Sequence, residues 1–280
     1  LVKSILKYSD KKIMNMDKLP KLTDNNNYAA FDLMLTIGGS AYLTMPDLNP
    51  LMIFKGLDIT FKKGISDLTA PLLGGYIIIL CGILNKIDVG YRMCQACLEI
   101  YHKYPNPRQY GSILTLMNLF GIHWKESLHT NTKNFLEAYK VCIENGDLTY
   151  AGFSINNYLR NSFYSGKELS SLNKEFALYF SKVKSMRQES AYSLISSLYQ
   201  MNENLIGKVS DPSILSGEIF NPEIDLPKLK AQQDNASIGF SYLMEVILSF
   251  LFEKYEYGLT RAVEFKRLID NDLSTINVPI

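Results

Sequence analysis

The chain has 280 residues, 47% of them hydrophobic, so it can bury a sizeable core and wholesale disorder is excluded. Its 29 basic and 28 acidic residues give a net charge of +1, which provides no overall field to attract nucleic acid or an anionic membrane. Four cysteines in so long a chain do not make a disulfide scaffold, and the sequence therefore predicts a reducing, cytoplasmic setting.

Neither a signal peptide nor a membrane-spanning helix is expected. Residues 1–15 carry lysines through the region where an apolar leader would lie. The two longest apolar runs, 70–84 and 238–252, are shorter than the roughly 18 to 20 residues that cross a bilayer. We therefore predict two buried helices here. The start at Leu1 without an initiator methionine, and the abrupt end at Ile280, indicate an excised fragment of a longer protein.

A unit that recurs about every 40 residues is the most informative pattern in the chain. Each copy is an apolar helix, a short polar break and a longer amphipathic helix. The breaks fall at 85–88, 124–126, 164–167 and 253–258. A repeat at this spacing predicts stacked helical pairs, because one pair alone cannot bury its apolar face.

At the N-terminus, residues 1–22 predict one short helix and a linker, and residues 23–280 form the helical-repeat domain. Thr23 or Asp24 can cap the first long helix, which runs to about Met45. After a break at Pro46, a second helix continues to about residue 63. The next helices are expected at 69–84 and 88–104, 107–124 and 127–144, 147–165 and 168–186, and 189–205.

The rhythm is interrupted over residues 207–233, where glycines and prolines predict a long irregular insert. A last pair follows, with Asp234 as a candidate cap. Apolar residues spaced by three and four, as over 169–183, mark helical stripes, and no alternating run suggests strands. The sequence thus predicts an all-α, right-handed solenoid of about five helical pairs.

Few residues suggest chemistry. Cys94 and Cys97 form the only CxxC, and since no second ligand pair follows, we interpret both thiols as small apolar packing groups rather than a redox or metal site. The pairs Gly38–Gly39 and Gly74–Gly75 stand in no phosphate-binding motif, so we interpret them as close helix contacts. No cofactor and no metal are expected.

Candidate contact residues are aromatic. His123 beside Trp124 can form part of a groove, given the enrichment of tryptophan at interaction hot spots. Most of the tyrosines are expected to bury their rings, and a minority to line a concave surface. We name His123, Trp124, Tyr158 and Tyr164 as the candidate interaction surface.

Eight stretches carry a resemblance to one family: LTD at 22–24, LCGIL at 80–84, HWK at 123–125, ENGDLTYA at 144–151, GKEL at 166–169, LSGE at 215–218, FLFEKYE at 250–256 and VP at 278–279. In this order they resemble the helical-repeat region of large multidomain signalling proteins. Those proteins combine a serine/threonine kinase domain, an AAA-type ATPase, a tetratricopeptide-like region, a GAF domain and a sensor histidine kinase.

The resemblance implies tetratricopeptide-like helical pairs, although the unit is longer than the usual value of about 34 residues. It also implies no catalytic residue, because the family places its kinase and nucleotide-binding motifs outside this region. We therefore expect a non-catalytic regulatory scaffold whose partners are neighbouring domains of the same polypeptide or another signalling protein. A sensor that binds a small molecule or peptide on its concave face is the alternative. An enzyme is disfavoured, since no set of residues meets the first requirements of an active site.

Overall fold

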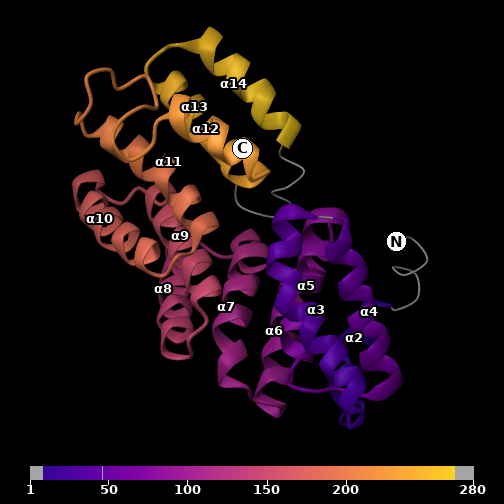
Figure 1. Cartoon of the computed structure of the whole chain (residues 1–280). Coiled ribbons are helices and arrows are strands. Elements are labelled where there is room, and N and C mark those ends of the chain that lie inside the picture. The colour runs from indigo at the N-terminus through magenta and orange to yellow at the C-terminus, as the bar shows by residue number, and fades with distance from the viewer. Residues whose placement is uncertain (1–8, 46, 269–280) are drawn as a thin grey trace. The chain divides into compact units, whose positions relative to one another are not determined.

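The structure, a computed structural model, describes residues 9–45 and 47–268 (Figure 1). Within these residues the chain forms thirteen α-helices and no strand, and its one isolated bridge pairs Lys21 with Ile65. The expected all-α class is therefore confirmed. Pro46, the first part of the expected N-terminal helix and the closing Val278–Pro279 lie outside the described residues.

In the middle of the chain, six helix starts recur with a period close to the expected 40 residues. Helices α6, α8 and α10 begin at residues 87, 128 and 169, and helices α7, α9 and α11 begin at 107, 148 and 189, so both series advance by 41 residues each time. Their bounds are α6 Ile87–Lys103, α7 Pro107–Phe120, α8 Leu128–Glu144, α9 Leu148–Tyr164, α10 Leu169–Ser185 and α11 Glu189–Leu205. The first elements are α2 Asp10–Met14, α3 Asn25–Thr44, α4 Leu48–Lys63, α5 Thr69–Ile78 with its π-helical continuation Ile79–Ile83, and the last are α12 Pro222–Ala231, α13 Asn235–Leu251 and α14 Tyr255–Leu268.

Local signals in the sequence explain where these helices begin and end. The Asp24 carboxylate accepts the backbone N–H groups of residues 26 and 27, each at 3.1 Å, and so caps α3. Asp234 caps α13 in the same way, through the N–H of Ser237 at 3.0 Å. Gly166 has a φ of 78°, a left-handed conformation that ends α9 and that glycine adopts without steric cost.

The irregular insert expected over 207–233 is wrong for its C-terminal part, which forms α12. Pro222 occupies the first helical position, where its missing N–H group is not needed, and the Asn221 side chain accepts the N–H of Glu223 at 3.0 Å. Pro222 is therefore compatible with a helix start, and Pro227 is accommodated inside α12. The last break is also shorter than expected: α14 begins at Tyr255, so only Phe252–Lys254 separate it from α13.

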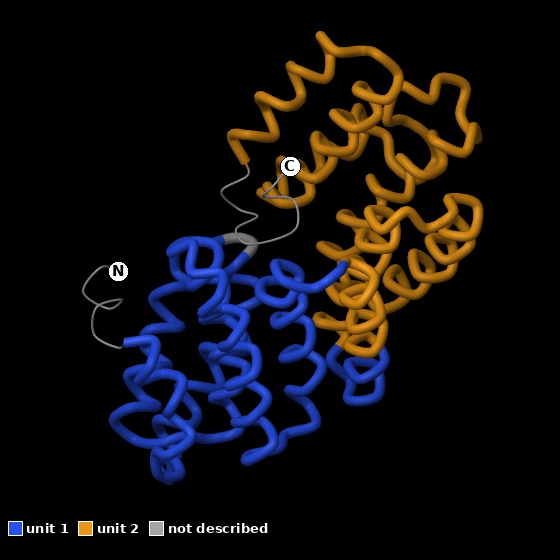
Figure 2. Tube along the Cα trace, turned by 180° about the vertical axis from the view of Figure 1, so that it is seen from behind, with its two compact units in different colours: residues 1–127, 140–147, 273–280 blue, residues 128–139, 148–272 orange. Residues whose placement is uncertain are grey.

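The described chain divides into two compact units (Figure 2). Unit 1 runs to Ser127 and includes Lys140–Asp147, and unit 2 takes Leu128–Tyr139 and the described residues from Leu148 onward. Helix α8 thus contributes residues to both units. The helical region expected as one domain over 23–280 is distributed over the two.

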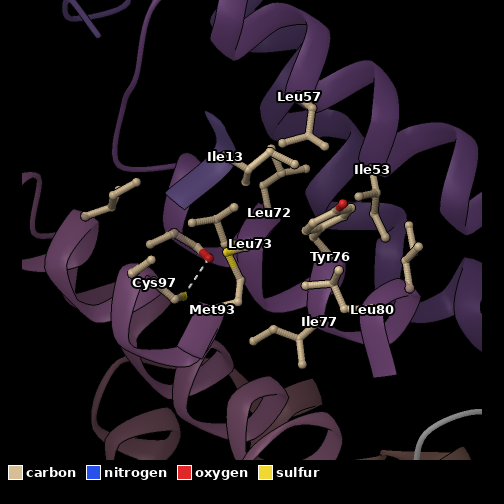
Figure 3. Close-up of a cluster of buried hydrophobic side chains, with 14 of the residues drawn as sticks. Ile13, Ile53, Leu57, Leu72, Leu73, Tyr76, Ile77, Leu80, Met93 and Cys97 are labelled. Atoms are coloured by element: carbon tan, nitrogen blue, oxygen red, sulfur yellow. Dashed lines mark hydrogen bonds between the residues drawn. The ribbon is translucent and has the colours of Figure 1, made fainter. Parts of the chain in front are cut away.

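Unit 1 has one continuous apolar core (Figure 3). Leu72, Leu73 and Tyr76 of α5 lie at its centre, and α5 packs against α4, α6 and α7. Ile13 of α2 is fully buried in the same core. The backbone of residues 20–22 exchanges hydrogen bonds with Ile65, so this stretch is fixed against unit 1 and is not a free linker.

Unit 2 is built from successive helical pairs. Helix α9 packs against α10 and α11, α11 packs against α10 and α13, and α13 packs against α12 and α14. Rings fill the α10–α11 contact, where Phe176 stacks on Tyr199 with centroids 5.2 Å apart and Phe180 stacks on Tyr192 at 4.5 Å. Each helix therefore has its main contacts with the next one or two helices of the chain.

The connection between α11 and α12 is ordered by two amide side chains. Gln200 Oε1 accepts the backbone N–H groups of Ile219 and Phe220 at 3.1 and 3.2 Å, and its Nε2 donates to Asn204. Asn204 Nδ2 in turn donates to the backbone carbonyl of Pro212 at 3.2 Å. Because buried backbone groups need partners, these amides hold the loop in place without regular structure.

Gln200→Leu is expected to lower the free energy of unfolding by about 2 kcal/mol, since it leaves two loop N–H groups without their acceptor. The loop contains Lys208, so limited digestion with trypsin should cut the variant there faster than the parent chain. Gln232→Leu, at an exposed site after α12, is the matched control, and trypsin should cut it after Lys208 at the parental rate. Equal rates for the two variants would show that Gln200 does not hold the loop.

Candidate interaction surfaces

The four candidate contact residues lie in both units. His123 and Trp124 are adjacent in the 3-10 turn Ile122–Trp124 of unit 1, whereas Tyr158 and Tyr164 lie on α9 in unit 2. On a helix, residues six positions apart point to different sides, and Tyr158 and Tyr164 do so here. The structure therefore gives two candidate surfaces that have to be considered one at a time.

In unit 1, the His123 and Trp124 rings lie with centroids 4.9 Å apart. Trp124 is half-buried and packs against the unit 1 core, and both ring nitrogens of His123 are buried. Lys125, the next residue, is exposed and pairs with Asp88 at the start of α6, with 2.5 Å between Nζ and Oδ1. The core thus holds Trp124 and Asp88 pairs with Lys125, so the turn offers a partner the part of Trp124 that is exposed and the charged side chain of Lys125.

In unit 2, Tyr158 is buried and belongs to a polar cluster that joins α9 to α10. Its hydroxyl donates to Glu175 Oε2 at 3.0 Å, and Lys167 Nζ lies 2.7 and 2.8 Å from the two oxygens of Glu175. Tyr158 also meets Tyr179 edge to face, and Tyr179 meets Tyr139 in the same way. The candidate contact residue Tyr158 is therefore mainly a structural link between two helices.

Electrostatics support this structural role. Burial raises the pKa of Tyr158, so its hydroxyl keeps its proton at neutral pH. Desolvation lowers the pKa of Lys167, but its hydrogen bonds to Glu175 and Tyr158 outweigh that effect and leave the pKa raised. Tyr158 is consequently a neutral phenol and Lys167 an ammonium at neutral pH, and both hold Glu175 of α10 through hydrogen bonds.

Sequence reasoning missed a polar side of α9 that is buried. Asn156, Asn157, Arg160 and Asn161 are each at most 5% exposed and share one side of the helix. Asn157 donates to the carbonyl of Phe153 and accepts a hydrogen bond from Arg160, whose guanidinium lies over the ring of Phe240 of α13 at 5.8 Å. The signal was visible in the sequence as three asparagines and an arginine within six consecutive residues of a 17-residue helix.

The oxygens of two of these amides have no hydrogen-bond partner among the described residues. They are Oδ1 of Asn156 and Oδ1 of Asn161, and both atoms are buried. A buried polar atom without a partner costs roughly 1–3 kcal/mol, so such atoms are uncommon in folded proteins. This side of α9 is therefore able to accept hydrogen bonds that the described residues do not supply.

The cysteine pair packs as expected. Cys97 Sγ donates to the carbonyl of Ala70 at 2.9 Å (Figure 3), and Cys94 is 4% exposed. Burial raises the pKa of Cys94 to about 12 and also raises the pKa of Cys97, so neither is a thiolate at neutral pH. No cluster of three or more His, Cys, Asp or Glu side chains suited to a metal ion occurs in residues 9–45 and 47–268.

The two glycine pairs differ in how closely neighbouring residues approach them. A Cβ on Gly74 would come 3.0 Å from Leu116, and one on Gly75 would come 3.3 Å from Ile53, so these two glycines allow the close contact expected of them. A Cβ on Gly38 would meet nothing within 4 Å, so no packing there requires a glycine, although its carbonyl accepts a hydrogen bond from Asn49 Nδ2 of α4 at 3.2 Å. Its helix α3 has a largely exposed outer side, which includes Leu33.

None of the described helices combines the length and the apolarity that crossing a bilayer requires. Set against protein-family models, curated proteins and solved structures, the chain gives no match to any of them.

Proposed function

We propose that the chain is a non-catalytic helical-repeat scaffold, a solenoid of tetratricopeptide-like pairs that regulates a multidomain signalling ATPase or kinase. The order of helix contacts carries the proposal: main contacts join helices that are next or next but one in the chain, and helix starts recur every 41 residues in the middle of it. Contacts of this local kind are typical of helical-repeat arrays, which offer long surfaces to partners. The resemblance to the helical region of signalling proteins supplies the signalling context.

In this proposal the partners are neighbouring domains of the same polypeptide or another signalling protein. The Trp124 turn sets a partly exposed tryptophan beside the charged pair of Lys125 and Asp88, a composition typical of protein contacts. The turn between α9 and α10 offers Tyr164 beside the exposed Ser165 and Gly166. Helix packing would then pass changes between the domains on either side.

Site-specific photo-crosslinking tests the scaffold. A photoreactive residue is placed at Lys125 beside Trp124, at Ser165 beside Tyr164, or, as an exposed control on α12, at Ile224. Each version is then incubated with the separately expressed domains that flank this region in its parent protein. We expect crosslinks from position 125 or 165 well above those from position 224. Equal, background-level crosslinks from all three, under conditions where the whole parent signals, would contradict the proposal.

The alternative role is a sensor of a small molecule or peptide. It is favoured by one observation, the buried amide oxygens of Asn156 and Asn161 that accept no hydrogen bond within the described residues. A ligand that binds only the folded chain raises its melting temperature. A thermal-shift screen over metabolites, repeated on Asn161→Leu, separates the two roles. A shift that the variant loses supports the sensor, and no shift together with domain crosslinks supports the scaffold.

A further inference from the structure

Helix α14 has an exposed apolar stripe on the side that faces away from α13. Tyr255, Leu259 and Val263 follow one another every four residues, which places them along one line of the helix, and Leu259 is 68% exposed. Phe250, at the end of α13, is 69% exposed and its ring contacts Tyr255 edge to face. Large apolar side chains gathered on one helix side mark an interaction surface more often than scattered ones do.

The opposite side of α14 is the one that packs on α13. Gly258 is buried against Ser249, and a Cβ on Gly239 of α13 would come 3.4 Å from Leu268. Arg261 and Tyr257 reach Glu245 of α13 from this side as well. Helix α14 lies along α13 (Figure 1), and the apolar stripe is left over after α14 has made its contacts with α13.

Helix α10 shows how unit 2 treats the corresponding side of an outer helix. When the first residues of α10 and α14 are aligned, Leu259 corresponds to Asn173. Asn173 is 9% exposed, and its side-chain oxygen accepts a hydrogen bond from Asn202 of α11 at 2.8 Å. In α10 this side is covered by another helix, so the stripe of α14 has the position and composition of a helix-docking face.

Charges along α14 indicate which helix fits. Glu256 lies near the N-terminal end of the stripe, and Lys266 and Arg267 lie at its C-terminal end, all three exposed. A second α14 running in the opposite direction, with Leu259 opposite Val263, brings Glu256 opposite Lys266 and Tyr255 opposite Arg267. An antiparallel arrangement therefore pairs opposite charges and a ring with a guanidinium, whereas a parallel one sets like charges together.

We propose that α14 docks antiparallel on α14 of a second copy of this chain and forms a two-fold symmetric homodimer. Such an interface is isologous, so every favourable contact occurs twice. Because the stripe is a single helix face, the interface is small and the dimer dissociates on dilution in the micromolar range. The proposal does not depend on the scaffold role.

Sedimentation velocity of the full chain, from about 5 to about 200 µM, should show a monomer–dimer equilibrium. Leu259→Glu is expected to give a monomer throughout that range, while Ile224→Glu, at an exposed apolar site on α12, leaves the equilibrium unchanged. Far-UV circular dichroism of each variant checks that the helices are retained. A monomer at every concentration for the parent chain, or a dimer that persists in Leu259→Glu, overturns the proposal.

Charge exchange tests the antiparallel register. Glu256→Lys and Lys266→Glu should each weaken self-association about tenfold, because like charges then face each other twice. Mixing the two variants should restore a dimer, since each new lysine then faces a glutamate. The double variant should self-associate like the parent. A mixture that stays monomeric, while Leu259→Glu still abolishes the parental dimer, would contradict antiparallel pairing and point to another helix as the occupant.

Discussion

Arg261→Leu is expected to destabilise the α13–α14 pair by about 2 kcal/mol near pH 7.5, and by clearly less at pH 5. Glu245 of α13 is 3% exposed, and its carboxylate Oε2 lies 3.0 Å from Arg261 Nε. The Nε hydrogen is donated to Tyr257 OH, and Tyr257 OH donates to Glu245 Oε1 at 2.9 Å. Removing the cation leaves a buried carboxylate with one hydrogen bond. Because Arg261 is partly exposed, the cost falls below that of a fully buried pair.

The pH dependence follows from the sign of the Glu245 shift. Burial raises its pKa, while Arg261 and the hydrogen bond from Tyr257 lower it, and the net pKa lies above the usual value of 4.5. A carboxyl with a raised folded-state pKa binds its proton more tightly when folded, so its contribution to stability is complete below the unfolded value and is lost as the pH rises through the folded one. Without Arg261 the folded pKa rises further, and the loss becomes larger.

Urea unfolding followed by far-UV circular dichroism at pH 5 and 7.5 measures these differences. Glu245→Gln combined with Arg261→Leu is the matched control, because it removes the titrating group and should recover most of the stability lost at pH 7.5. Equal losses for Arg261→Leu at both pH values, or no recovery in the double variant, would show that the buried carboxylate is not the cause.

The second large effect is expected where α6 meets the end of the α5 segment. Gly90 of α6 lies against Cys81, and a Cβ at position 90 would overlap the Cys81 sulfur. The next nearest atoms are the Cβ of Leu80 at 3.7 Å and that of Cys81 itself at 3.9 Å, which are ordinary contacts. Gly90→Ala should therefore lower the free energy of unfolding of unit 1 by about 1–3 kcal/mol through overpacking.

In a Cys81→Ala background the same change should reverse its sign. The obstructing sulfur is gone, and alanine is favoured over glycine in a helix by up to about 1 kcal/mol.

Gly111 provides the contrast. A Cβ there would overlap the Cys142 sulfur and would also lie 3.1 Å from the Cys142 backbone nitrogen. Cys142→Ala should therefore rescue Gly111→Ala only in part. Trp124, the only tryptophan, lies in unit 1, and its fluorescence can follow the unfolding. If Gly90→Ala were equally destabilising in the parent chain and in the Cys81→Ala background, the contact with the Cys81 sulfur would be ruled out as the cause.

The sequence predicts the helices well because their boundaries depend on local signals. Asp24 and Asp234 accept the N–H groups that open α3 and α13, and Gly166 adopts the left-handed conformation that closes α9, so each signal acts within a few residues of itself. Helix α12 was missed because Pro222 also occurs in loops, and only its place directly after a capping asparagine distinguishes the two cases.

Contacts between distant parts of the chain could not be predicted in this way. Gln200 and Asn204 bond to backbone groups of residues 212–220, and these bonds form only because that loop folds back over α11. The spacing of residues along the sequence does not predict such a path. The same limit applies to the candidate surface. Tyr158 was predicted to contact a partner because it is a tyrosine, but its hydrogen bonds with Lys167 and Glu175 make it a link between two helices. Nothing local in the sequence shows which tyrosines will find such partners.

All four cysteines of the chain are buried and belong to unit 1. A thiol that is protonated and shielded reacts with a disulfide reagent only when the structure around it opens. The rate of native-state labelling therefore reports the free energy of opening unit 1 alone, without any engineered probe. A cysteine introduced on an exposed site of unit 2 would react at once, so fluorophores can be attached there while the natural thiols are left in place.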